Sequence, residues 1–242
     1  ARDGHEVTVI DRLSEAASET SFANAGLIAP GHAYTWSSPK APRILLRSLI
    51  DDSQALRFRP SLDPRLWSWS LKFLKNCTAE RTRTNTKRKV RLCMYSQDRL
   101  GEIVADTGVE YHGLDGGLLY LYRKPESFAR GAANTRILAE EGLELRAIDP
   151  DEAARIDPAL EPVKAKFAGA VYCPSDGSGD ARVFTRNLAR HCAEKLGVTF
   201  LFDTVVQGFE TQGDRIAAVK TSKGAVAADE FVLCLGVFAP DF

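Results

Sequence analysis

Asp11 is the first residue of the chain whose type and position could do specific chemistry. It directly follows the apolar run Val7–Ile10, which is typical of a parallel strand buried in a sheet. A carboxylate at the carboxyl end of such a strand can accept hydrogen bonds from both hydroxyls of an adenosine ribose. A strand-ending Asp that closes a turn is the equally common alternative.

The expected partner of such an acid is not in the sequence. In a dinucleotide-binding βαβ unit the acid lies about 20 residues beyond a Gly-x-Gly-x-x-Gly turn that cradles the pyrophosphate. Only ten residues precede Asp11, and the pattern occurs nowhere in the 242 residues. We therefore expect the chain to begin inside the first crossover helix, with Gly4 as the left-handed cap after it.

A second candidate site lies in residues 13–38, which are rich in Ser, Ala, Gly and Pro without clear periodicity. Such a stretch predicts an extended, functional loop. Within it, Ser21–Gly26 gathers small side chains around Asn24, so backbone N–H groups could approach a phosphate or a ring closely. A flexible surface loop is the alternative. His32 and Tyr34 could border a substrate pocket, although a lone histidine is more often structural.

The remaining sequence must position these segments. Asp63-Pro64 is a typical helix start and Thr107-Gly108 a typical helix end. We expect helices at 63–77, 81–106, 126–141 and 150–156, with one strand at 117–122. The last third predicts a helix at 181–196, a short strand at 198–202, a meander of 204–210, 215–221 and 225–228, and a buried strand at 231–236.

Composition excludes several functional classes. Lys plus Arg equals Asp plus Glu at 32 each, so no global field favours nucleic acid. The apolar runs are far shorter than the roughly 18 residues that cross a bilayer. Five cysteines without a Cys-x-x-Cys pair and four scattered histidines argue against a disulfide framework or a zinc site. The chain also lacks the Gly-x-Ser-x-Gly elbow of many hydrolases.

A basic cluster in the predicted helix 81–106 follows several aromatic residues. Such a cationic, aromatic face could rest on an anionic membrane surface. A solvated helix face is the more common explanation of a charge cluster, and an aromatic stripe is more often core than anchor. The basic residues are Arg81, Arg83, Lys87, Arg88, Lys89 and Arg91, and the aromatic residues are Trp67, Trp69 and Phe73.

The order of elements and four segments carry a family resemblance. The segments are Glu19–Gly26, Gly116–Leu121, Cys173–Asp180 and Phe184–Ala189. They resemble the bacterial FAD-dependent D-amino-acid dehydrogenases of the D-amino-acid oxidase superfamily, and the resemblance runs along essentially the whole chain. Members of that family extend beyond both ends of this sequence, so the resemblance implies a fragment.

The resemblance implies an α/β fold with two domains. One is a glutathione-reductase-like FAD-binding domain, incomplete and discontinuous, at 1–36 and 165–242. The other is an inserted, mostly helical substrate domain with part of a sheet, at 37–164.

The resemblance also implies which residues contact the cofactor. Asp11 and Arg12 would bind the ribose, and the loop Ser21–Gly26 would lie along the FAD. The backbone of Val206 would pair with the adenine edge. Cys234 stands where alanine is commoner, and Phe238 where an aromatic is usual. Asp180 is expected to cap its helix, and the substrate clamp is expected beyond Phe242, so no catalytic residue is assigned. The implied contacts are Asp11, Arg12, Ser21, Ala23, Asn24, Ala25, Gly26, Val206, Cys234 and Gly236.

The implied activity is oxidative deamination of D-amino acids to 2-oxo acids and ammonia, with FAD as cofactor and a quinone as electron acceptor. Such a protein would be cytoplasmic, in peripheral contact with the inner membrane. Another amine or imino-acid oxidase of the superfamily and a non-catalytic fragment stay open as alternatives. Without its glycine turn and central strand, the 242-residue piece alone is expected to hold little FAD and to be inactive.

Overall fold

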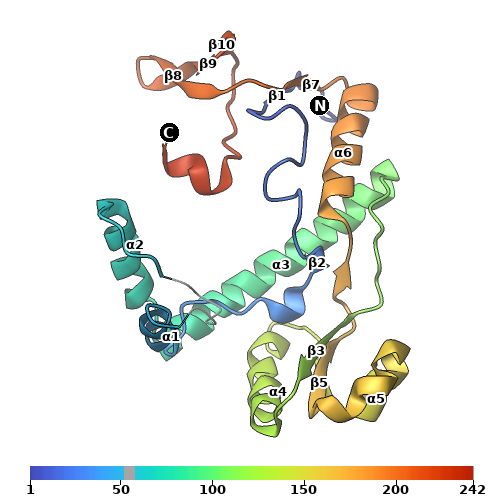
Figure 1. Ribbon diagram of the computed structural model, residues 1–242. Coiled ribbons are helices and arrows are strands. Elements are labelled where there is room, and N and C mark those ends of the chain that lie inside the picture. Colours follow the sequence, from blue (N-terminus) through green and yellow to red (C-terminus); the bar gives the residue numbers. More distant parts are fainter. Residues whose placement is uncertain (52–57, 242) are drawn as a thin grey trace. The chain divides into compact units, whose positions relative to one another are not determined.

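The computed structural model describes residues 1–51 and 58–241, and the chain forms two compact units. Unit 1 comprises 1–26, 104–112 and 179–242, and unit 2 comprises 27–103 and 113–178. Mixed helices and strands confirm the predicted α/β class. Figure 1 colours the chain from its N-terminus to its C-terminus, and each unit is described below by itself.

Unit 1 is built from a parallel strand pair, one long helix and a meander. Strand β1 (Thr8–Ile10) pairs in parallel with β7 (Thr199–Leu201). Helix α6 (Ala181–Leu196) begins at Asp180, whose side chain accepts a hydrogen bond from the Val183 N–H, and ends at Gly197 with φ +67°. The predicted helix, strand and meander are confirmed. The meander strands are β8 (Val206–Gln212), β9 (Arg215–Thr221) and β10 (Gly224–Ala227), paired in the order β10-β9-β8.

The first strand is parallel as predicted, but the expectation that it is buried is wrong. Thr8 is exposed, and Val9 keeps 39% of its surface exposed. A strand is buried when neighbours cover both its edges and both its faces. Within the described residues β1 has one hydrogen-bonded neighbour, β7.

The predicted buried strand at 231–236 is also wrong. Residues 231–235 have no regular structure, and a 3₁₀ helix follows at Gly236–Asp241. Val232 is 85% exposed. An apolar run becomes a strand only when a neighbouring strand satisfies its backbone N–H and C=O groups. No strand among the described residues pairs with this run.

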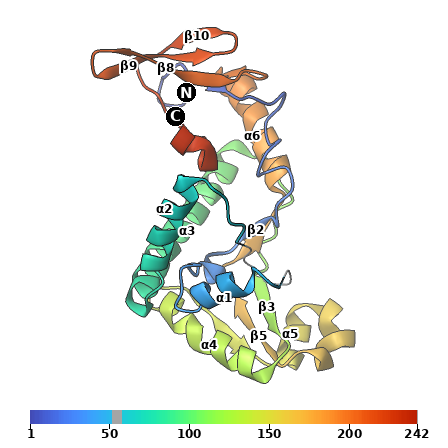
Figure 2. The same cartoon turned by 60° about the vertical axis from the view of Figure 1, so that its left-hand side comes forward.

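Unit 2 contains a three-stranded antiparallel sheet in the order β3-β5-β4. The predicted strand at 117–122 is confirmed as β3 (Leu118–Tyr122), but the central strand β5 (Gly169–Cys173) and the edge strand β4 (Arg146–Ile148) were not predicted. The two predicted helices beside it are confirmed. In both views they flank β3 and β5 (Figures 1 and 2). They are α4 (Pro125–Ala139) and α5 (Pro150–Ile156).

Two further predicted helices are confirmed, one within unit 2 and one that begins in unit 2 and ends with residues 104–107 of unit 1. Helix α2 (Pro64–Lys75) begins at Asp63, whose side chain accepts a hydrogen bond from the Arg65 N–H. Helix α3 (Ala79–Thr107) is followed by Gly108 with φ +64°, as the sequence indicates. The other elements of the unit are short: β2 (Leu27–Ile28), η1 (Pro30–His32), α1 (Ala41–Arg47), η2 (Pro158–Lys166) and β6 (Gly177–Ser178).

Unit 2 has two small hydrophobic clusters. One joins Val90 of α3 and Leu138 of α4, both without exposed surface, to Ala33 and Leu143. The other packs Ile148, Ala153, Phe167 and Ala170 beneath the sheet strands β4 and β5. Both clusters draw on segments far apart in sequence: the first holds α4 on α3, and the second holds α5 on the sheet.

The division into units differs from the predicted domain boundaries. Leu27–Ile28 pair antiparallel with Gly177–Ser178, so the segments 27–36 and 165–178 belong to unit 2. Residues 104–112 belong to unit 1, because the Tyr111 carbonyl accepts the Asp180 N–H. The assignment of 1–36 and 165–242 to FAD binding and of 37–164 to the substrate stays a prediction.

Candidate cofactor-binding site

Asp11 lies at the carboxyl end of β1, where the sequence places it. Its backbone N–H donates to the Leu201 carbonyl at 3.1 Å, and its carbonyl accepts the Thr204 N–H at 3.0 Å. One carboxylate oxygen, Oδ1, accepts the Leu13 N–H at 2.9 Å. The other oxygen, Oδ2, has no hydrogen-bond partner among the described residues. Asp11 can therefore close the turn through Oδ1 and still accept hydrogen bonds from a ribose through Oδ2.

Arg12 connects the two ends of unit 1. Its guanidinium pairs with the Glu19 carboxylate and stands 4.5 Å from the centre of the Phe238 ring. Arg12, next to the candidate ribose-binding Asp11, therefore contacts both Glu19, just before the Ser21–Gly26 loop, and the C-terminal segment. This side chain is exposed, so the ion pair by itself contributes little to stability.

The loop Ser21–Gly26 presents its backbone. Ala23, Asn24 and Ala25 are exposed, and Asn24 Oδ1 accepts the Gly26 N–H at 2.8 Å. The N–H groups of the three exposed residues have no hydrogen-bond partner in the described part of the chain. A run of open N–H donors beside small side chains is the arrangement that phosphate or a ring carbonyl requires.

Gly26 is held where only glycine fits. It has φ +63°, and a Cβ built on it would lie 2.3 Å from the Gly179 carbonyl oxygen. The Gly179 N–H donates to the Gly26 carbonyl at 2.8 Å, so the two backbones are in direct contact. This contact fixes the end of the loop against the segment that leads into α6.

Two arginines of α6 hold the first part of the loop. Arg182 and Arg186 both pair with Glu15, at 3.3 and 3.0 Å. The Arg182 guanidinium also stands 4.1 Å from the centre of the Phe22 ring, while its Nε is buried without a partner among the described residues. The loop is therefore anchored by charge at Glu15 and by ring contact at Phe22.

The remaining predicted contacts are less defined. Val206 opens β8 and is half-buried, two residues beyond Thr204, which bonds to Asp11. Cys234 is exposed, and Gly236 has φ +55° at the start of the C-terminal 3₁₀ helix. All ten predicted residues lie in unit 1, but their contact with FAD stays a prediction.

Sequence reasoning assigned no role to a buried carboxylate in unit 2. Asp176 has no exposed surface, and its oxygens accept the Gly31 N–H at 2.9 Å and the Tyr120 hydroxyl at 2.6 Å. His32 stacks on the Tyr120 ring at 5.1 Å, and Tyr34 meets His32 edge-on at 5.8 Å. The available signal was an Asp between Pro-Ser and Gly, three residues after the apolar run that ends at Cys173.

The groups around Asp176 are held in their neutral forms. Burial and the hydrogen bond to Asp176 raise the pKa of Tyr120. Burial also raises the pKa of Tyr34 to about 12 and raises the pKa of the Cys173 thiol. These groups therefore stay neutral at physiological pH, so the Tyr120 hydroxyl keeps the proton that it donates to Asp176.

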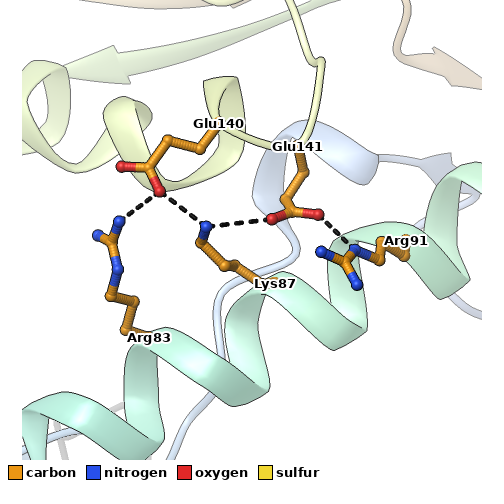
Figure 3. A network of polar contacts seen from close by, with 5 residues as sticks. All are labelled: Arg83, Lys87, Arg91, Glu140 and Glu141. Atoms are coloured by element: carbon orange, nitrogen blue, oxygen red, sulfur yellow. Dashed lines mark hydrogen bonds and ion pairs between the residues drawn. The ribbon is translucent and has the colours of Figure 1, made fainter.

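The predicted basic cluster of α3 is mostly engaged within unit 2. Arg83 and Lys87 pair with Glu140, and Lys87 and Arg91 pair with Glu141, as Figure 3 shows. Lys89 donates to the Tyr34 carbonyl at 3.1 Å. These cations hold the end of α4 and the loop after η1 on α3, and three of the six predicted basic residues are thereby paired with glutamates.

The whole chain matches a known family. The family model described as DAO, FAD dependent oxidoreductase, matches residues 1–242. D-amino acid dehydrogenase 2 of Mesorhizobium japonicum is 46% identical over 236 residues, which are 98% of this chain and 57% of that protein. D-amino acid dehydrogenase of Agrobacterium fabrum is 40% identical over 242 residues, 100% of this chain and 58% of that protein.

Solved structures show the same fold. An L-amino acid deaminase from Proteus myxofaciens aligns with TM-score 0.63 at 18% identity, over 98% of this chain and 42% of that one. A glycine oxidase from Bacillus cereus aligns with TM-score 0.57 at 19% identity, over 93% of this chain and 47% of that one. The chain spans about 57% of the length of the curated relatives that it matches. With the family model matched from the first residue to the last, the chain belongs to the DAO family of FAD-dependent oxidoreductases.

Proposed function

We propose that the full-length protein oxidises D-amino acids to 2-oxo acids and ammonia and passes the electrons to a quinone. The observation that carries this proposal is the 46% identity along 98% of the chain to a protein named D-amino acid dehydrogenase 2. The structures aligned at 18% and 19% identity support the fold alone, so they do not select the substrate.

The residues of unit 1 fit the cofactor of the family. Asp11 Oδ2 is an acceptor without a partner in the described residues, at the carboxyl end of a parallel strand. The three successive N–H groups of Ala23, Asn24 and Ala25 likewise have no hydrogen-bond partner among the described residues. A ribose supplies two hydroxyl donors, and the pyrophosphate and flavin carbonyls of FAD supply acceptors. The donors and acceptors of the two sides therefore match.

In this proposal each part of unit 1 has a defined task. Asp11 accepts from the ribose, and the loop 21–26 lays its N–H groups along the cofactor, with Gly26 held by the backbone of Gly179. When bound, FAD supplies the acceptor for the hydride that leaves the Cα of the amino acid. The protein contributes orientation, because a hydride moves only when donor and acceptor are aligned in contact.

The place of action follows from the proposed electron acceptor. A quinone of a respiratory chain is dissolved in the membrane, so an enzyme that reduces it must approach the lipid surface. We therefore include peripheral membrane contact in the proposal. No helix in the described residues has the length and apolar character needed to span a bilayer.

Anaerobic reduction of the bound flavin tests the activity. The full-length protein, loaded with FAD, is mixed without oxygen with D- and L-amino acids, glycine, sarcosine and proline, while flavin absorbance is followed. We expect D-amino acids to bleach the flavin and their L-enantiomers to leave it oxidised. Bleaching by glycine, sarcosine or proline alone would instead assign another amine or imino-acid oxidation. No bleaching by any of these substrates would indicate a non-catalytic protein.

A further inference from the structure

The segment 13–26, which ends in the loop Ser21–Gly26, is held in place mainly by side chains. Its backbone bonds to Asp203 at Leu13 and to Gly179 at Gly26. Between these two ends it makes no backbone hydrogen bond to another segment of the described residues. In both views the segment runs beside α6 (Figures 1 and 2). Side chains of α6 are therefore the groups that can place its interior.

Arg182 of α6 contacts this interior at two points. Its guanidinium pairs with Glu15 at 3.3 Å and stands 4.1 Å from the centre of the Phe22 ring. Arg186, one turn later on the same face of the helix, reaches Glu15 at 3.0 Å. Arg182 thus joins two parts of the segment that are seven residues apart in the sequence.

The Arg182 guanidinium keeps this place although one of its N–H groups is unsatisfied. Its Nε is buried and has no hydrogen-bond partner among the described residues. A buried N–H without a partner disfavours the conformation that contains it, and a long arginine side chain could turn such a group to water. The contacts with Glu15 and Phe22 therefore outweigh the loss at Nε and determine where this side chain lies.

Phe22 directly precedes the three N–H groups that are candidates for cofactor contact. Those of Ala23, Asn24 and Ala25 have no partner among the described residues, and Gly26 after them is fixed by the backbone of Gly179. The three donors therefore lie between two fixed points, both set by residues 179–182 at the start of α6. A ligand that uses several donors binds more tightly when they are oriented before it arrives.

We propose that Arg182 is a positioning residue for FAD. By holding Glu15 and Phe22, it keeps the N–H groups of residues 23–25 in the arrangement that the cofactor needs. This inference rests on the proposed contact between the loop and FAD, and it does not depend on which amine the flavin oxidises. It adds to the ten predicted contacts a residue that acts through the loop.

Titration of the full-length apoprotein with FAD, followed by fluorescence, measures the effect. Arg182→Gln removes both contacts and should raise the dissociation constant of FAD about tenfold, since a partly exposed ring contact and ion pair each contribute a few-fold. Arg182→Lys keeps a charge for Glu15 but lacks the planar group that stacks on rings, and should raise the constant about threefold. Urea denaturation of each apoprotein shows that it is folded.

Phe22→Leu and Arg190→Gln separate positioning from charge. Phe22→Leu stays apolar but loses the ring, and should raise the FAD dissociation constant about threefold. Phe22→Leu/Arg182→Gln should stay near the effect of Arg182→Gln, about tenfold, because the two side chains act through one contact. Arg190 is exposed and donates to Asn187 of the same helix, so Arg190→Gln removes one cation without touching the loop. It should leave the constant within about twofold.

Limited cleavage by chymotrypsin gives a readout that needs no FAD. This protease cuts after aromatic residues such as Phe22 when the chain around them opens. In the apoprotein of Arg182→Gln, cleavage after Phe22, identified by mass spectrometry, should be about tenfold faster than in the wild type, because the open loop is more populated. Arg190→Gln should be cut at the wild-type rate.

The outcomes separate this inference from the proposed function. Equal weakening of FAD binding in Arg190→Gln overturns it, since net charge would then explain the loss. Faster cleavage of Arg182→Gln with unchanged FAD affinity also overturns it, since the placed loop would not serve the cofactor. Loss of FAD in Gly26→Ala but in neither Arg182 variant overturns the role of Arg182 alone. Weakened binding in Arg182→Gln that Arg182→Lys partly restores supports the inference, even if D-amino acids leave the flavin oxidised.

Discussion

The Tyr120 hydroxyl donates a 2.6 Å hydrogen bond to Asp176, a residue without exposed surface. The carboxylate also accepts the Gly31 N–H, so it connects strand β3 to the turn that follows β2. A Cβ built on Gly31 would lie 2.5 Å from the same carboxylate, which shows how closely the two segments approach. The Asp176 side chain therefore joins segments that are far apart in the sequence.

The first prediction concerns the hydrogen bond from Tyr120 to Asp176. Tyr120→Phe removes a donor from a buried carboxylate and should lower the free energy of unfolding by about 1–3 kcal/mol. Urea denaturation measures it. Tyr172→Phe is the matched control, because the Tyr172 hydroxyl donates to the Gly116 carbonyl near the surface, where water can replace it. An equal loss in both variants would contradict a special role for the buried pair.

The second prediction concerns Gly26. Gly26→Ala would place a methyl group 2.3 Å from the Gly179 carbonyl oxygen in a left-handed backbone, so the loop must shift. Gly197→Ala has nearly the same φ but nothing within 4 Å, so it carries only the conformational strain of about 1–2 kcal/mol. We expect Gly26→Ala to be the less stable of the two in urea and to lose FAD from the full-length protein. FAD retained equally in both variants would argue against the loop as a cofactor contact.

The third prediction concerns Asp11. Asp11→Asn keeps an oxygen for the Leu13 N–H but removes the charge and one acceptor. A hydrogen bond to a charged group contributes about 1.5–3 kcal/mol, so FAD affinity of the full-length protein should fall about tenfold to a hundredfold. Asp203→Asn, an exposed change in the same unit, should leave affinity unchanged. Fluorescence titration of the apoprotein with FAD distinguishes these results.

The fourth prediction concerns pH. Ion pairs with Arg83 and Lys87 lower the pKa of Glu140 to about 2 from its ordinary value of 4.5. Because the folded pKa is the lower one, the stabilisation is complete above about pH 4.5 and is lost as the pH falls through about 2.

Thermal unfolding of wild type and Glu140→Gln at several pH values measures this effect. The variant should melt below the wild type at pH 7, and the two melting temperatures should converge near pH 2. Glu144→Gln removes an exposed carboxylate whose contact with Arg146 is 3.6 Å long, and it should match the wild type throughout. A melting difference for Glu140→Gln that persists at pH 2 would refute the ion-pair explanation.

The fifth prediction concerns the start of α6. Asp180→Ala leaves the Val183 N–H without its cap and should lower stability by about 1 kcal/mol. Asp180→Ser can still cap the helix and should recover most of that loss. If Ser and Ala behaved alike in urea denaturation, the capping bond would not be what stabilises this end.

The sequence predicted the helices and strands whose ends are set by nearby residues. Asp63-Pro64, Gly108 and Gly197 mark helix ends through their own backbone preferences, and the structure places helix ends there. Tight turns likewise fixed the meander, since two short turns leave adjacent strands few ways to pair.

Long-range pairing could not be predicted in the same way. Strand β5 is buried because β3 and β4 lie on its two sides, and its own short sequence does not reveal these neighbours. The apolar run at 231–236 looks equally like a strand but has no partner among the described residues. Asp176 meets Gly31 across 145 residues, a relationship that no local pattern encodes. The sequence could indicate the candidate site through Asp11, because this residue directly follows an apolar run that the structure shows as strand β1.

Lys87 lies between two carboxylates that are adjacent in the chain, and beneath them Val90 packs in one cluster with Leu138. The middle of α3 and the last turn of α4 thus share both polar and apolar contacts. They should open together, so their amide protons should exchange with deuterium at one common rate. Charge removal at Lys87 would accelerate that exchange in two segments fifty residues apart and leave the β8–β10 meander unaffected.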